Sequence, residues 1–385
     1  MLQKKLRAVF MRGGTSKALM FHQRDLPAAR EDWAPIFLGA IGAPDPNGRQ
    51  LDGMGGGVSS LSKVCVIGPP SRNDADVDYT FAQVSVKDAV VDYSGNCGNM
   101  SSAVGPFALD EGLVSAGGGN QACVRIHNTN TKKIIVSRFP IEEGLAAVDG
   151  DFVLPGVAGS GAPIRLEFTD PGGAGTGRLL PSGAPTDVLE VPGLGAIEAS
   201  LIDAANPCVF VAAEALGASG LEMPDQLEAD AALLAKLEAI RCAAGVRMGL
   251  ARDAAAAAKI TGIPKIAMVS APRAAKTLSR ETVEADAMDI AARMISVGQP
   301  HRAMPLTGAM CLAVATRIEG SIPQRLARPP KTPGDDIRIA QPSGLTVVAA
   351  TVRRNGGPGG WRADNAVVYR TARRLMEGVV YFRAR

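Results

Sequence analysis

The chain has 385 residues, of which 46% are apolar and 21% are charged, and its net charge is +3. This length exceeds one hydrophobic core and suits two domains. The charges are mixed and lack the Lys/Arg runs and interleaved aromatic residues that track a nucleic-acid backbone, so we expect no nucleic-acid partner. No apolar run approaches the roughly 18 residues of a membrane span. Residues 1–6 also lack a signal-peptide pattern, and we expect a cytoplasmic protein without membrane contact.

The chain has six cysteines at irregular spacings and three histidines, and it contains no CxxC or HxxxH pair. These patterns favour reduced thiols over a disulfide framework and argue against a built-in zinc site. Five cysteines lie in apolar runs without neighbouring glycines. We expect these five to be buried and inert: Cys65, Cys123, Cys208, Cys242 and Cys311.

Short β-type runs dominate the first half of the chain. Strands are predicted at residues 8–11, 63–67, 79–84, 89–92, 122–126 and 133–139, and helices at residues 33–41 and directly after Cys97. The Gly- and Pro-rich residues 156–185 indicate a long loop. We therefore predict an N-terminal lobe of residues 1–185 and a C-terminal lobe of residues 186–385. About the last 15 residues are expected to pack back on the first lobe.

The second half repeats this composition. Strands are predicted at residues 188–191, 196–202, 209–211, 265–269, 345–352 and 366–369, and helices at residues 231–247, 285–296 and 309–318. The segment Thr307-Gly308-Ala309 opens an apolar helix much as Cys97-Gly98-Asn99 does. This similarity suggests two related lobes that present helix N-termini to one cleft.

The sixth cysteine lies in Ser94-Gly95-Asn96-Cys97-Gly98-Asn99, directly before apolar residues at helical spacing. Free backbone N–H groups and the dipole at a helix N-terminus favour a thiolate and bind carboxylates. We therefore predict that Cys97 is reactive.

Two further segments carry candidate functional groups. Met11-Arg12-Gly13-Gly14-Thr15-Ser16-Lys17 follows a predicted strand and lacks the Walker spacing, so it is either an anion-binding turn or an ordinary glycine turn. Lys63, after Ser62, opens an apolar strand. It is either an edge lysine that extends to solvent or, if partly buried beside cations, a base.

These residues alone indicate a cleft for a small acidic compound with a lysine and a thiol available. A thiol hydrolase would need a histidine, but His22, His127 and His301 lie outside any recognisable Cys/His signature. Proton transfer beside a carboxylate needs only two proton-exchanging groups and donors for the enolate. The sequence therefore favours proton transfer.

The segments around Arg12, Lys63 and Cys97 resemble motifs of the PrpF family, and so do residues 52–56, 76–79, 187–193, 246–250 and 373–378. The resemblance covers the whole chain in order. It implies a methylaconitate isomerase, methylitaconate Δ-isomerase or oxalomesaconate tautomerase without a metal or organic cofactor. It also implies an α/β, diaminopimelate epimerase-like fold of two similar lobes, each a curved, mostly antiparallel sheet around a long central helix.

By this resemblance Lys63 and Cys97 form the catalytic acid/base pair. The epimerase relatives use two opposed cysteines, whereas the matching second-lobe position here reads Thr307-Gly308-Ala309, which argues against racemisation. We expect Lys63 to take a proton beside a carboxyl or keto group, and Cys97 or Lys63 to return one two carbons away. The hypothesised substrate-binding residues are Arg12, Gly13, Gly14, Thr15, Ser16, Ser62, Asn96, Gly98, Asn99, Thr307, Gly308 and Ala309.

The leading hypothesis is a cofactor-independent isomerase of an unsaturated di- or tricarboxylate, most like 2-methylaconitate isomerase. The alternatives are a 4-oxalomesaconate tautomerase of aromatic catabolism and a non-catalytic carboxylate-binding accessory protein. Some family members carry an acidic residue three positions before the cysteine, where this chain has Ser94. The choice of substrate therefore stays open, as does homo-oligomerisation.

Overall fold

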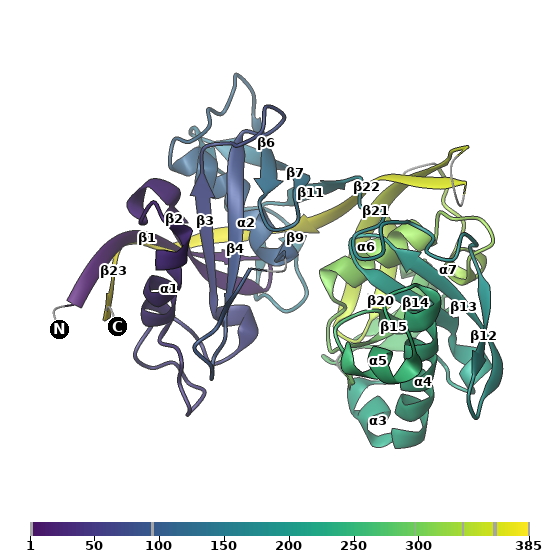
Figure 1. Ribbon diagram of the computed structural model, residues 1–385. Helices are drawn as coiled ribbons and strands as arrows, with labels where there is room; N and C mark the ends of the chain where they lie inside the picture. Colours follow the sequence, from purple (N-terminus) through teal and green to yellow (C-terminus); the bar gives the residue numbers. More distant parts are fainter. Residues whose placement is uncertain (1–2, 94–95, 297, 333–334, 357–359, 384–385) are drawn as a thin grey trace. The chain divides into compact units, whose positions relative to one another are not determined.

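The computed structural model describes residues 3–93, 96–296, 298–332, 335–356 and 360–383, shown in Figure 1. Ser94 and Gly95 of the cysteine motif lie outside these residues. The chain forms two compact units, one of Met1–Glu167 with Tyr369–Arg385 and one of Phe168–Val368. The boundary predicted at residues 185 and 186 stays a prediction.

The first unit contains most of the strands predicted for the first half of the chain. Its helices and 3₁₀ turns are η1 (Gln23–Asp25), η2 (Arg30–Asp32), α1 (Trp33–Ile41), η3 (Ser59–Leu61) and α2 (Gly98–Asp110). Its strands are β1 (Gln3–Gly13), β2 (Ser16–His22), β3 (Lys63–Gly68), β4 (Val77–Val84), β5 (Val91–Asp92), β6 (Gln121–Asn128), β7 (Lys133–Glu142), β8 (Leu145–Ala146), β9 (Phe152–Val153), β10 (Ser160–Gly161) and β23 (Ala372–Arg383). Two further strands, β11 (Ile164–Thr169) and β22 (Trp361–Arg370), contain residues of both units.

The sheet of the first unit joins the two ends of the chain. β1 pairs antiparallel with β2 on one side and with β23 on the other, so the first and last strands lie side by side (Figure 1). β2 pairs parallel with β3, β3 pairs antiparallel with β4, and β4 pairs parallel with β6. This order carries the starts of β2 and β3 to the same end of the sheet.

Two helices cover the two faces of this sheet. On one face, Trp33, Phe37 and Ile41 of α1 pack with the buried strand residues Leu19 and Val64. On the other face α2 lies against β1 and β7. A Cβ on Gly105 of α2 would come within 2.7 Å of the Phe139 side chain, so glycine is needed for this close approach.

A buried ion-pair network ties the end of α2 to three strands. Glu111 lies 2.8 Å from His22 Nε2, and it accepts hydrogen bonds from Arg374 at 2.8 Å and Arg7 at 3.0 Å. The side chains of Glu111 and His22 are 5% and 4% exposed. Burial raises the pKa of Glu111, but the bonds from His22 and Arg374 outweigh it and hold the pKa below its usual value.

Replacing Glu111 with glutamine is expected to lower the free energy of unfolding by about 3 kcal/mol at neutral pH, because His22 and Arg374 lose a buried anionic partner. The pKa of Glu111 is lower in the folded chain than in the unfolded chain. Its contribution is therefore present above the unfolded pKa and is lost as the pH falls through the folded pKa. Urea unfolding should show a smaller difference between wild type and variant in acid than at neutral pH.

Glu377→Gln is the matched control for this prediction. Glu377 also accepts from Arg374, at 2.7 Å, but its side chain is 65% exposed. We expect this substitution to cost less than about 1 kcal/mol. Equal losses in the two variants would contradict the importance of the buried network.

The second unit has its own sheet and helices. Its helices and 3₁₀ turns are η4 (Ala213–Leu216), α3 (Pro224–Ala229), α4 (Ala231–Arg247), α5 (Ala254–Lys259), η5 (Ala285–Ala287), α6 (Leu306–Ala315) and α7 (Ile322–Leu326). Its strands are β12 (Asp187–Val191), β13 (Gly195–Asp203), β14 (Pro207–Ala212), β15 (Lys265–Ser270), β16 (Ala275–Lys276), β17 (Thr282–Val283), β18 (Ile290–Ser296), β19 (Gln299–Pro300), β20 (Ile337–Gln341) and β21 (Gly344–Arg354).

Helices again lie on both faces of this second sheet. Leu237 and Ile240 of α4 pack with Val209 of β14. The adjacent strand residue, Cys208, faces the other way and contacts Cys311 of α6. Within the described ranges, no helix combines the length and apolar character that crossing a membrane requires.

Two sequence predictions about secondary structure were wrong. The helix predicted at residues 285–296 is a short 3₁₀ turn followed by β18, in which all seven residues are buried. A strand buried on both faces has no alternation, and its apolar run cannot be told from a helix by periodicity. The loop predicted at residues 156–185 contains β10 and β11, and β11 alternates between buried and half-buried side chains.

Candidate active site

The thiol of Cys97 caps helix α2. Cys97 has an extended backbone, with φ −102° and ψ 96°, and its Sγ accepts a hydrogen bond from the Met100 N–H at 3.5 Å. The N–H groups of Gly98 and Asn99 come first in the helix, where no intrahelical acceptor exists. The sulfur thus lies at the helix end that favours negative charge. Helix α2 begins directly after Cys97, as the sequence predicted.

Three asparagines hold the segment that leads into Cys97. Asn96 Oδ1 accepts a hydrogen bond from Asn128 Nδ2 at 2.8 Å. Asn130 Nδ2 donates to the Tyr93 carbonyl at 2.6 Å. Asn96 was predicted to bind substrate, but its amide oxygen is engaged within the protein. Its contact with Asn128 fixes the backbone from which Cys97 projects.

Lys63 is a buried amine at the first residue of β3. It is 7% exposed, and its Nζ donates to Gln83 Oε1 at 2.5 Å and lies 5.0 Å from the centre of the Phe81 ring. Gln83 Nε2 donates in turn to the Ser62 carbonyl at 2.9 Å. Lys63 is therefore not an edge lysine that extends to solvent. Gln83, which the sequence gave no reason to select, holds its amine in place.

Ser62 is fully buried, and its hydroxyl is turned toward the preceding loop. Its Oγ donates to Gln50 Oε1 at 2.6 Å and to the Val58 carbonyl at 2.9 Å. Gln50 has a left-handed φ of 54°, and its N–H donates to Asp45 at 2.5 Å. Ser62 was predicted to bind substrate. The structure instead engages its hydroxyl in the loop that positions the start of β3.

Lys63 and Cys97 both lie near the buried thiol of Cys65. Residues two apart on a strand share a face, so Lys63 and Cys65 project to the same side of β3. Cys65 donates to Tyr79 Oη at 3.9 Å, and Tyr79 also contacts Ser101 of α2. Burial raises the pKa of Cys65, Cys97 raises it further, and Tyr79 and Lys63 lower it. Both predicted catalytic groups are therefore within electrostatic reach of this inert thiol.

The other cysteines largely follow the prediction. Cys65, Cys208, Cys242 and Cys311 are buried, but Cys123 is exposed. The prediction for Cys123 was wrong because β6 alternates, and Cys123 takes an outward position beside the buried Ala122 and Val124.

The predicted anion-binding turn is a tight hairpin between β1 and β2. Gly13 pairs with Ser16, and Gly14 at the turn has a left-handed φ of 53°. A Cβ on Gly13 would come within 2.8 Å of the Asn99 carbonyl oxygen, so this strand end lies against the start of α2. Asn99 Nδ2 donates to Thr15 Oγ1 at 3.1 Å. The structure therefore brings Gly13, Gly14, Thr15 and Ser16 to the N-terminus of α2.

Arg12 belongs to the other face of the sheet. Side chains alternate along a strand, and its neighbour Gly13 faces α2. Arg12 Nη1 donates to the carbonyls of Gly14 and Thr371, both at 2.9 Å. The structure thus does not bring the guanidinium of Arg12, a predicted carboxylate ligand, to the start of α2.

A buried arginine that sequence reasoning missed lies beside Asn99. Arg370 is 8% exposed, and it donates from Nε to Asn99 Oδ1 at 3.1 Å and from Nη1 to the Tyr369 carbonyl at 2.7 Å. Burial lowers the pKa of Arg370 to about 10. No described carboxylate forms an ion pair with it. A buried cation without a counter-ion, next to a helix N-terminus, favours an anionic ligand.

Thr307, Gly308 and Ala309 belong to the first turn of α6, in the second unit. The helix begins at Leu306 after Pro305, earlier than predicted, and no side chain caps it. The Ala309 N–H donates to the Pro305 carbonyl at 2.9 Å, so this amide is engaged in the helix and does not hold a ligand. The binding roles of Thr307 and Gly308 stay predictions.

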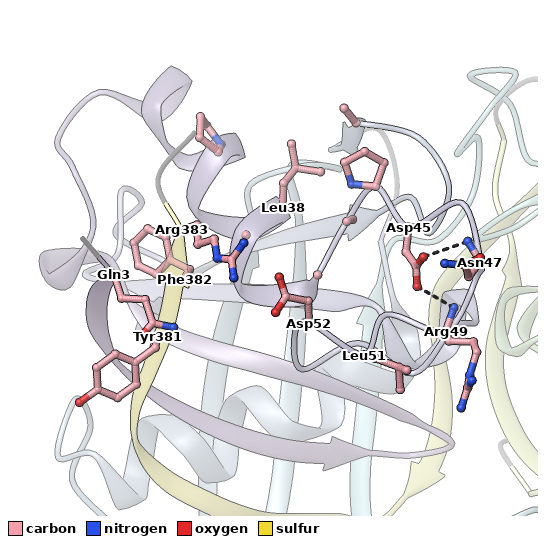
Figure 2. A pocket seen from close by; sticks show the side chains of 16 residues that line it. Gln3, Leu38, Asp45, Asn47, Arg49, Leu51, Asp52, Tyr381, Phe382 and Arg383 are labelled. Carbon is pink, nitrogen blue, oxygen red and sulfur yellow. Dashed lines mark hydrogen bonds between the residues drawn. The ribbon is translucent and has the colours of Figure 1, made fainter. Parts of the chain in front are cut away.

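A pocket of ≈850 Å³ beside the chain ends does not contain the predicted catalytic residues. Figure 2 shows it between Leu38, Leu51 and Phe382, with the Asp45 carboxylate bonded to the backbones of Asn47 and Arg49. Hydrogen bonds from the backbone N–H groups of Gln50, Asn47 and Arg49 hold the pKa of Asp45 below its usual value. Asp45 thus organises its own loop and is not a free acid or base.

The described residues contain no group of three or more His, Cys, Asp and Glu side chains placed to hold a metal ion. The polar groups around the start of α2 are the Lys63 amine, the Cys97 thiol, the first N–H groups of the helix and the Arg370 guanidinium.

The PrpF protein family matches residues 3–383. The chain belongs to this family. It is 41% identical to a 2-methyl-aconitate isomerase of Shewanella oneidensis, over 98% of this chain and 97% of the relative. It is 39% identical to a 4-oxalomesaconate tautomerase of Pseudomonas putida, over 98% of this chain and 96% of the relative.

Solved structures agree with this assignment. A crystal structure of methylitaconate-delta-isomerase superposes with a TM-score of 0.90 at 40% identity, covering 99% of this PrpF chain and 96% of that one. A hydroxyproline epimerase from Agrobacterium vitis shares the fold, with a TM-score of 0.51 at 12% identity, covering 98% and 92% of the two chains. The predicted family and epimerase-like fold are confirmed, and the relatives' names agree with the predicted isomerase class.

Proposed function

We propose that this PrpF protein is a cofactor-independent isomerase that moves a C=C bond in a small unsaturated di- or tricarboxylate, most like 2-methylaconitate isomerase. The observation that carries the proposal is the placement of two proton-exchanging groups around one buried thiol. Cys97 caps α2, and Lys63 is buried on the α2 side of β3. Such a pair suits 1,3-proton transfer.

In the proposed reaction the amine of Lys63 removes a proton from the carbon next to a carboxyl or keto group. The C–H electron pair enters a dienolate, whose oxygen charge is stabilised by N–H groups at the start of α2, while Arg370 holds a carboxylate of the substrate. A proton from the Cys97 thiol, or the one now held by Lys63, then adds two carbons away. When Cys97 donates, a proton passes from Lys63 to the sulfur through solvent and resets the pair.

Arg370 is our proposed anchor for a substrate carboxylate. Arg370→Met is expected to raise KM about 10- to 100-fold, because a hydrogen bond to a charged group contributes about 1.5–3 kcal/mol. Arg370→Lys keeps the charge but cannot form the same fork, and should recover part of the affinity. Steady-state kinetics beside thermal unfolding test this role. A stable Arg370→Met enzyme with unchanged KM would contradict it.

The second candidate is a 4-oxalomesaconate tautomerase. The observation that favours it is the similarity to the tautomerase of Pseudomonas putida. This chain is 39% identical to that tautomerase and 41% identical to the 2-methyl-aconitate isomerase, so identity alone separates the two candidates little. The two candidates share Lys63 and Cys97 and differ in substrate. Parallel kinetics with 2-methylaconitate and oxalomesaconate decide between them through the higher kcat/KM.

A carboxylate-binding protein without chemistry is the third candidate. It would bind the same acids and leave their carbon-bound hydrogens untouched, whereas an isomerase exchanges them with solvent. Binding of either acid by calorimetry without isomerisation or exchange would contradict the proposed enzyme.

A further inference from the structure

A second pocket of the first unit lies on the sheet face turned away from α2. This cavity of ≈540 Å³ is lined by Arg12, Lys17 and Arg373, together with residues of the segment 148–161. Strand register sets the three cations in one row across β2, β1 and β23, with Lys17 opposite Arg12 and Arg12 opposite Arg373. Directly opposed residues on neighbouring strands project to the same face, so the three side chains share this cavity.

The positive charge in this pocket is poorly compensated. Among the described lining residues, Asp149 is the one acid. None of the three cations forms an ion pair with a described residue. Burial lowers the pKa of Arg12, and the nearby charge of Arg373 lowers it further. Like charges held this close repel one another, and an anion between them would remove the repulsion.

Arg12 is held in position independently of any ligand. Its Nη1 donates to the carbonyls of Gly14 and Thr371, which fixes the guanidinium over the pocket. The Nζ of Lys17 lies 5.5 Å from the centre of the Phe10 ring. This contact orients the ammonium on the same face of the sheet as Arg12. Preorganised donors bind an anion with little loss of side-chain freedom.

We propose that this pocket binds a compact oxyanion with at least two negative charges, a polycarboxylate or a phosphate, separately from the site at Cys97. Guanidinium forks match the oxygens of either group, and Lys17 adds a further positive charge. Gly159, with a left-handed φ of 76°, and Gly161 let the facing backbone approach the ligand. None of the described lining residues comes from α2.

Isothermal titration calorimetry tests this pocket with pyrophosphate and, separately, with citrate. Because citrate is a tricarboxylate and also suits the site proposed at Cys97, both probes are titrated into wild type and into Arg370→Met, and binding that persists in Arg370→Met is assigned to this pocket. Wild type should bind at least one probe, and the stronger probe identifies phosphate or carboxylate chemistry. The double variant Lys17→Gln/Arg373→Gln should bind at least tenfold more weakly. The charge-matched control Lys4→Gln/Lys5→Gln, at exposed positions of β1, should bind as wild type does.

Three single variants separate this pocket from the site at Cys97 and a lost charge from a lost fold. Arg370→Met, at the start of α2, should leave pyrophosphate binding unchanged. Lys17→Arg should retain binding, and Lys17→Gln alone should weaken it if the double variant does not fold. Equal binding by wild type and Lys17→Gln would overturn the proposal, as would loss of binding in Arg370→Met alone. Absence of binding of both probes to wild type at millimolar concentration would overturn it too.

Discussion

Replacing Lys63 with methionine is expected to lower kcat/KM for the unsaturated acid by about 10²- to 10⁴-fold, the range of a positioned general acid or base. Methionine keeps an apolar chain of similar length beside Phe81 but removes the amine that Gln83 holds. The loss should fall mainly on kcat, because the amine acts on the reacting carbon and not on a distant carboxylate. Steady-state kinetics of the purified variant measure it.

Lys265 offers a matched control for this substitution. It too is the first residue of a buried strand, β15, and its Nζ donates to Ser296 Oγ at 2.9 Å. Burial lowers the pKa of Lys265. Lys265→Met therefore removes a comparable partly buried amine, and we expect it to change kcat/KM less than about tenfold. A Lys63→Met enzyme as active as Lys265→Met would exclude Lys63 as the base.

Cys97→Ser is expected to lower kcat by about 10²- to 10⁴-fold, because a hydroxyl is a far weaker acid than a thiol. Serine is a favourable helix N-cap, so α2 should keep its start and the protein its stability. The same kinetics with a thermal unfolding curve separate lost chemistry from lost structure. Unchanged kcat would leave Lys63 as both base and acid.

Cys123→Ser is the control for the thiol. Cys123 is exposed on β6, away from any glycine-flanked helix start. Its replacement is expected to leave kcat and stability unchanged. A large loss with Cys123→Ser would show that thiol replacement harms the enzyme by a route other than Cys97.

Local signals predicted the elements that build the site. The bounds of α1 match residues 33–41, and α2 starts after Cys97, because helical spacing and flanking glycines are properties of the local sequence. β18 could not be predicted in the same way. Its Arg293 is 1% exposed and donates to the carbonyls of Leu221 and Glu222, partners that only the folded chain supplies.

The residues of the site likewise fall into those that the local sequence indicates and those that only the folded chain brings together. The prediction that Cys97 is reactive rests on the residues next to it, whereas the positions of Gln83, Arg370 and Arg12 depend on which strands pair. Gln83 is opposite Lys63 only because β3 pairs with β4. Arg370 ends an apolar run and meets Asn99 from far along the chain. The direction of Arg12 follows from the pleat of β1 once Gly13 is known to face α2.

Proton NMR in deuterium oxide tests the central claim most directly. The enzyme is incubated with cis-aconitate, methylaconitate and oxalomesaconate in turn, as wild type, Lys63→Met and Cys97→Ser. With wild type we expect double-bond migration and deuterium at carbon for at least one acid, and in Lys63→Met we expect both to be strongly reduced. Wild type that binds these acids without exchange or migration would contradict an isomerase, and exchange at the wild-type rate in Lys63→Met and Cys97→Ser would contradict the assigned residues.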